Sequence, residues 1–102
     1  METEQLTISP NRTAHLLACL TEEAGEVSQL VGKCLRFGIQ DYHPKTGSIP
    51  NIELLENEIN DFIAISRMLG IEPNEYEIKA KIKRVEKYMQ YAKENGAYKE
   101  DV

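Results

Sequence analysis

The chain has 102 residues, and its 17 acidic and 12 basic side chains give a formal net charge of −5. This charge argues against a nucleic acid polymer as a ligand, because the surfaces that bind one are usually basic. No apolar run is long enough to cross a membrane, and the first residues lack a secretory signal pattern. We therefore expect one helical domain over residues 1–102, with flexible ends at about 1–8 and 96–102.

The two cysteines, Cys19 and Cys34, fall on the first predicted helix. Their positions put them about 22 Å apart along the helix axis, which is too far for a disulfide. They are therefore predicted to be reduced thiols, which is typical of a cytoplasmic protein.

Ser9 and Pro10 predict the start of this long first helix, with Ser9 as the N-cap and Pro10 at the first helical position. Gly38 is expected to end the helix in a left-handed conformation. The helix would span about 27 residues, or roughly 40 Å. Its apolar residues recur at steps of three and four and predict this buried face: Leu16, Leu20, Ala24, Val27, Val31 and Cys34.

Residues 39–51 are predicted to form a loop, which is either functional or a plain crossover. Asn51 is predicted to cap a second helix that ends at Gly70. Its apolar face is Ile52, Leu55, Ile59, Phe62, Ser66 and Leu69. Asn74 and Glu77 fit the capping box of a third helix, which Gly96 would end. Its apolar face is Ile78, Ile82, Val85, Met89 and Ala92.

These three helices predict an all-α protein, an antiparallel bundle of three main helices. The helices are long and the core they can build is thin. We therefore expect a homodimer or homotetramer in which a second subunit completes a four-helix core.

Carboxylates fall on or beside the apolar faces of the first two helices. On a helical wheel, Glu23 and Glu58 lie inside the apolar arcs, and Glu26 and Asp61 lie at their margins. Glu22 lies next to Glu26. Several carboxylates facing each other in a core are costly unless they are protonated, paired with bases or bound to a shared cation. Few basic residues fall near them, so a cation is the favoured explanation.

Carboxylate oxygens without His or Cys ligands favour Mg²⁺, or Mn²⁺, over Zn²⁺. A di-iron bundle is disfavoured because neither His15 nor His43 forms a Glu-x-x-His motif. The alternative to a metal site is an ordinary acidic amphipathic helix. Two acidic motifs on two predicted buried faces make that alternative the weaker one.

The pattern Glu22-Glu23-x-x-Glu26 followed by Glu58-x-x-Asp61 resembles the signature of the MazG-like, all-α nucleoside triphosphate pyrophosphohydrolase superfamily. The resemblance covers about residues 14–92. The spacer between the motifs, 31 residues, is slightly longer than is usual in that superfamily because of the loop. The resemblance implies hydrolysis of a nucleoside triphosphate, NTP or dNTP, between its α- and β-phosphates.

The resemblance also implies roles for the acidic residues. Glu23, Glu26, Glu58 and Asp61 look like ligands of Mg²⁺. Glu22 looks like a catalytic helper that orients the attacking water or binds a further ion.

Basic and polar residues are expected to complete a substrate site. Lys81 and Arg84 lie on or beside the apolar arc of the third helix and are candidate phosphate contacts, with Lys33 and Arg36 as weaker candidates. The alternative for Lys81 is that its stem packs along the core edge. The remaining candidates are Asn57, near the second motif, and Tyr88, which would either stack on a base or simply pack.

Two rival functions stay open at this point. One is phosphoribosyl-ATP pyrophosphatase, which belongs to the same superfamily. The other is a non-catalytic helical module that binds nucleotide or protein and regulates a partner.

Overall fold

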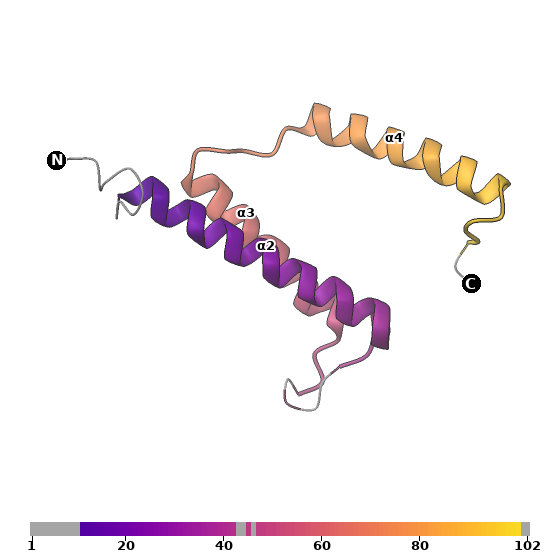
Figure 1. Cartoon of the computed structure of the whole chain (residues 1–102), viewed down its shortest axis with the longest axis horizontal. Helices are drawn as coiled ribbons and strands as arrows, with labels where there is room; N and C mark the ends of the chain where they lie inside the picture. Colours follow the sequence, from indigo (N-terminus) through magenta and orange to yellow (C-terminus); the bar gives the residue numbers. More distant parts are fainter. Residues whose placement is uncertain (1–10, 43–44, 46, 101–102) are drawn as a thin grey trace. The chain divides into compact units, whose positions relative to one another are not determined.

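The computed structural model describes residues 11–42, 45 and 47–100. Over these residues the chain forms three α-helices and no strand, which confirms the all-α prediction (Figure 1). The helices are α2 (Arg12–Phe37), α3 (Asn51–Met68) and α4 (Glu75–Glu94). The chain divides into two compact units, Met1–Glu72 and Pro73–Val102, so that α2 and α3 form one unit and α4 belongs to the other.

Helices α2 and α3 form an antiparallel hairpin and lie side by side (Figure 1). Hydrogen bonds join the two helices at both ends of the hairpin. At the open end, Arg12 Nη1 donates to the carbonyl oxygen of Met68 over 3.3 Å. At the loop end, Asn51 Nδ2 donates to the carbonyl oxygen of Gly38 over 3.0 Å. The carboxylates of the two acidic motifs lie between these ends.

Helix α2 begins later than its sequence predicts. Its N-cap is Asn11, whose side chain accepts the backbone N–H of Ala14 over 2.7 Å. Asn is as good an N-cap as Ser, which explains why the helix begins at Arg12. The predicted cap, Ser9, and Pro10 lie outside the described residues.

The ends of the other helices agree with the sequence in most respects. Asn74 caps α4 by accepting the N–H of Glu77 over 3.0 Å. Gly70 and Gly96, which follow α3 and α4, have positive φ values of 87° and 76°. Gly38 also has a positive φ of 103°, but its ψ of 149° places it outside the left-handed helical region that was predicted.

The prediction that Asn51 caps α3 is wrong. Pro50 occupies the cap position without any side-chain hydrogen bond, and Asn51 is the first helical residue. Asn51 is 4% exposed, and its amide side chain bonds to Gly38 at the end of α2. The side chain therefore joins the two helices instead of closing the first turn of its own helix.

The core of the hairpin is small. Among the described apolar residues, Leu16 and Leu30 are the buried ones. The predicted face of α2 is wrong at two positions, because Ala24 and Val31 are exposed. The line of residues that faces α3 instead passes through Glu23 and Leu30. On α3, Ile59 was also assigned to the core but is 42% exposed.

Helix α4 carries its predicted apolar stripe, but every large member is substantially exposed. Ile78, Ile82, Val85 and Met89 are between 39% and 50% exposed. None of the helices in the described part of the chain is sufficiently long and apolar to span a membrane.

Candidate metal centre

Glu23 occupies a core position of α2. It lies seven residues after Leu16 and seven before Leu30, the two buried leucines. Seven residues make nearly two turns of an α-helix, so all three side chains point to the same side. That side packs against α3, and Glu23 is half-buried there. The helical repeat of α2 thus places a carboxylate at a position that is occupied by leucine about two turns before it and two turns after it.

Glu58 occupies the equivalent position on α3. It lies seven residues after the buried Asn51 and seven before the half-buried Ile65, on the side of α3 that faces α2. Each helix of the hairpin therefore contributes one inward-facing glutamate at mid-length. The antiparallel pairing brings these two glutamates together.

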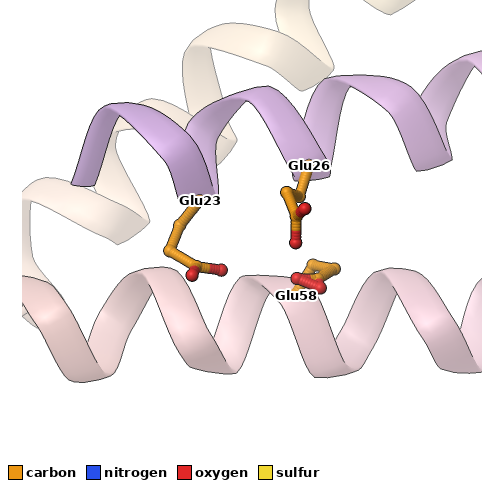
Figure 2. Close-up of side chains that lie close together, drawn as sticks. All are labelled: Glu23, Glu26 and Glu58. Carbon is orange, nitrogen blue, oxygen red and sulfur yellow. The ribbon is translucent and has the colours of Figure 1, made fainter. Parts of the chain in front are cut away.

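Figure 2 shows Glu23 and Glu26 of α2 pointing toward Glu58 of α3. One carboxylate oxygen from each of the three lies within 4.8 Å of the others. Glu23 and Glu58 are half-buried, whereas Glu26 is exposed at the edge of the cluster. This spacing makes the three oxygens, which come from two facing helices, candidate ligands of a single cation. The cluster is called the carboxylate triad below.

The environment of Glu23 favours its protonated form. Burial raises the pKa of Glu23 above its ordinary value of 4.5, and repulsion from Asp61, Glu26 and Glu22 raises it further. A hydrogen bond with Glu58 acts in the opposite direction. Three neighbouring carboxylates, and not one alone, therefore raise the pKa of Glu23.

The pKa of Glu58 is raised as well. Burial is the largest cause, followed by a hydrogen bond with Glu26 and by repulsion from Glu26, Asp61 and Glu23. The hydrogen bond with Glu26 raises the pKa of Glu58, whereas the bond with Glu58 lowers that of Glu23. Without a cation, burial and mutual repulsion therefore favour the protonated forms of both Glu23 and Glu58.

Two oxygens of the triad have no partner. Glu23 Oε1 and Glu58 Oε1 are both buried, and neither accepts a hydrogen bond. The ion pairs found in the described part of the chain, Arg67 with Glu72 and Lys93 with Glu100, do not include the triad. Buried carboxylate oxygens without donors are uncommon in folded proteins, and a bound cation would satisfy both of these oxygens at once.

Asp61 and Glu22, the other acidic candidates, lie at the margin of the triad. Both are exposed, and both raise the pKa of Glu23 by repulsion, which places them close enough to act on it. Neither belongs to the group of three oxygens within 4.8 Å. The role of Asp61 as a ligand and that of Glu22 as a helper stay predictions.

The structure does not bring the basic candidates of α2 to the triad. Arg36 lies in the last turn, where its Nε donates to the Gly32 carbonyl over 3.4 Å and its guanidinium lies 5.0 Å from the ring centroid of Phe37. Lys33 is exposed in the turn before it, and Asn57 is exposed on α3. Substrate contacts by Lys33, Arg36 and Asn57 stay predictions.

Three further candidates, Lys81, Arg84 and Tyr88, lie on α4 in the second compact unit. All three side chains are exposed, and Tyr88 is 69% exposed. Neither Lys81 nor Arg84 takes part in the ion pairs found among the described residues. Both cations are therefore available to an anionic ligand.

An open apolar groove of about 250 Å³ lies beside the triad on the α2–α3 hairpin. It is lined by Ala24, Val27, Ile59 and Phe62. Each lining residue directly follows one of the four predicted metal ligands in the sequence. The groove and the carboxylates therefore occupy adjacent strips of the same two helices. Sequence reasoning missed the groove because it assigned all four lining residues to a closed core.

Comparisons with known proteins add no assignment, because no family model, no curated protein and no solved structure matches the chain. The geometry of the hairpin and the two acidic motifs are therefore the features that point to a function.

Proposed function

We propose that the chain is a Mg²⁺-dependent nucleoside triphosphate pyrophosphohydrolase that converts an NTP or dNTP to the monophosphate and pyrophosphate. The observation that carries the proposal is the pair of buried, unpartnered oxygens of Glu23 and Glu58 within the carboxylate triad. The resemblance of the acidic motifs to the MazG-like superfamily supports the choice of reaction.

The residues fit a hard divalent cation. All three members of the triad offer carboxylate oxygens, the ligands that Mg²⁺ and Mn²⁺ prefer. Three carboxylates in such proximity also repel one another, and a cation removes that repulsion. Glu23, Glu26 and Glu58 would hold the ion, and Asp61 at the margin would contribute a further oxygen.

When bound, the ion would neutralise the charge of the triphosphate and lower the pKa of the attacking water. The residues of the chain position the reactants. Glu23 and Glu58 are fixed by the packing of the helices, whereas Glu26 is exposed and can adjust to the substrate. Glu22 is exposed beside them and is the candidate base that takes a proton from the water. Lys81 and Arg84 would bind the phosphates.

A second subunit would complete the helical core. The hairpin buries only Leu16 and Leu30 among its described apolar side chains, while Ile59 in the groove is 42% exposed. Two packed helices leave one face of each uncovered, and bundles usually cover such faces with further helices. We propose that the chain is a homodimer or homotetramer and that another copy covers the groove. A cytoplasmic location belongs to the same proposal.

The test is pyrophosphate release from the common NTPs and dNTPs, with Mg²⁺, with Mn²⁺ and with EDTA. The expected result is metal-dependent release with a nucleoside monophosphate as the second product. Activity on phosphoribosyl-ATP alone would reassign the enzyme to the related pyrophosphatase. No turnover of any of these substrates, together with no thermal shift by either metal, would contradict the proposal and favour a regulatory module.

A further inference from the structure

Asn51 is the most buried polar residue among those that the structure describes, with 4% of its surface exposed. Its Nδ2 donates to the carbonyl oxygen of Gly38 over 3.0 Å, and its backbone N–H donates to that of Asp41 over 2.7 Å. The next residue, Ile52, donates its N–H to the carbonyl oxygen of Ile39 over 2.9 Å. The first turn of α3 is thus bonded to the segment that leaves α2.

These bonds fix the register of the hairpin at its loop end. Gly38 is the C-cap of α2, and its own N–H is bonded to Cys34 over 2.9 Å, so the carbonyl that Asn51 reaches is held by α2 itself. Translation of α3 along its axis by the rise of one residue would displace Asn51 by about 1.5 Å. Rotation of α3 about its axis by one residue would move Asn51 through about 100°. Either change would break the bond to Gly38.

The bond at the other end of the hairpin is less restrictive. Arg12 reaches the Met68 carbonyl over 3.3 Å with a long, exposed side chain. Such a side chain can follow a small movement of α3, because several rotatable bonds separate its guanidinium from the backbone. The short, buried side chain of Asn51 has no such freedom.

We propose that Asn51 is a positioning residue for the carboxylate triad. It lies seven residues before Glu58 on the same side of α3, about 10 Å along the helix. By tying the start of α3 to the end of α2, it sets where Glu58 stands relative to Glu23 and Glu26. The effect on metal binding rests on the proposed function, whereas the effect on helix register does not.

Register can be measured without metal or substrate. Ala18 of α2 and Ala64 of α3 are exposed, so nitroxide labels can be attached after Ala18→Cys and Ala64→Cys in a background carrying Cys19→Ser and Cys34→Ser. Asn51→Asp keeps the shape of the side chain and removes its donor. After dilution into unlabelled protein, which removes distances between subunits, we expect a narrow distance distribution with Asn51 and a shifted or broadened one with Asn51→Asp. Asn51→Leu, which has a similar shape and neither a donor nor a charge, provides a second variant if Asn51→Asp does not fold.

Metal binding is measured on the same variants, without labels, by the paramagnetic resonance of free Mn²⁺. We expect the dissociation constant for Mn²⁺ to rise about tenfold, the scale on which groups that orient metal ligands act. Leu16→Ala is the matched control, because it removes packing from the buried face of α2 without touching the bond between Asn51 and Gly38. It is expected to lower the thermal midpoint and to leave both distance and affinity unchanged.

The outcomes separate the two proposals. If Asn51→Asp lowers only the thermal midpoint, as Leu16→Ala does, Asn51 is merely structural and the inference is wrong. The inference also fails if the distance shifts while Mn²⁺ affinity stays the same. If the unsubstituted protein binds no Mn²⁺, only the proposed metal centre is contradicted. The distance measurement still decides whether Asn51 sets the register of the two helices.

Discussion

Glu23 and Glu58 face each other from the two helices of the hairpin, and each has a buried oxygen without a hydrogen-bond partner. Both occupy positions where an apolar residue would pack better, since Leu16 and Leu30 flank Glu23 on the same side of α2. Two acids placed in this way lower the free energy of unfolding of the metal-free protein. The residues that we propose for activity are therefore residues that reduce stability.

This opposition predicts how stability depends on pH. The pKa values of Glu23 and Glu58 are raised in the folded protein, so above pH 4.5 the native state holds protons that the unfolded chain has released. Metal-free stability should therefore fall as pH rises through the raised pKa values. The glutamine introduced by Glu58→Gln cannot ionise. From about pH 5 to about pH 8, the thermal midpoint of this variant should therefore fall less than that of the unsubstituted protein. Thermal denaturation in EDTA measures both midpoints.

The control for this prediction is Glu56→Gln on the exposed side of α3. Its midpoint should follow that of the unsubstituted protein across the same pH range. Parallel curves for Glu58→Gln and the unsubstituted protein would show that the pKa of Glu58 is not raised on folding.

Added metal should reverse the pH effect. A cation binds the ionised carboxylates and competes with protons for them, so its stabilising effect should grow as pH rises. The shift in thermal midpoint caused by Mg²⁺ or Mn²⁺ should be larger at about pH 8 than at about pH 5. It should be absent from Glu58→Gln. An equal shift in that variant would place the metal elsewhere.

Activity should depend on the triad and its margin. Glu58→Gln and Asp61→Asn keep nearly the same side-chain volume, so the fold should persist and far-ultraviolet circular dichroism should not change. Turnover with Mg²⁺ should fall by about 100-fold or more, because each substitution removes the charge of a carboxylate that we propose as a ligand of the ion. Glu53→Gln, at an exposed position of the same helix, should keep nearly full turnover. Full turnover in both test variants would exclude these carboxylates from the reaction.

Much of the fold follows from the sequence because the signals that specify it are local. The spacing of the apolar residues predicts the three helices, and Asn74, Gly70 and Gly96 mark helix ends that the structure confirms. The same helical repeat places Glu23 and Glu58 on inward faces. These features require only the geometry of one helix at a time.

The errors occur where one helix meets another. Residues 23 and 24 are adjacent in the sequence but about 100° apart around the helix. An apolar scale chooses Ala24, although the side of α2 that packs against α3 runs through Glu23. Asn51 has the composition of an N-cap, and nothing local shows that its side chain reaches Gly38 instead. The pairing of the two helices decides which residue of α2 faces α3 and what the Asn51 side chain contacts. That pairing cannot be predicted from the sequence of either helix alone.

Cations of α4 should act on substrate binding. Lys81→Ala and Arg84→Ala each remove a charged group that we propose contacts phosphate, so KM should rise about tenfold for each. Lys79 and Lys83 are exposed at positions about 100° or more around the helix from both Lys81 and Arg84, so Lys79→Ala and Lys83→Ala serve as controls with the same loss of charge. If all four variants raised KM equally, and high salt abolished the effect, general electrostatic attraction would explain it instead of specific contacts.

The groove beside the triad should be covered by another copy of the chain. Ile59 lines this groove and is 42% exposed, so Ile59→Asp would place a charge where the second subunit packs. Burying an unpaired charge at an interface is strongly unfavourable, and the dissociation constant of the assembly should rise by about 100-fold or more. Sedimentation velocity over a range of protein concentrations measures the change. Ala64→Asp, at an exposed position of α3, is the control and should leave the assembly intact. A monomer at every concentration for the unsubstituted protein would contradict the proposed oligomer, because the groove would then face solvent and Ile59→Asp would change little.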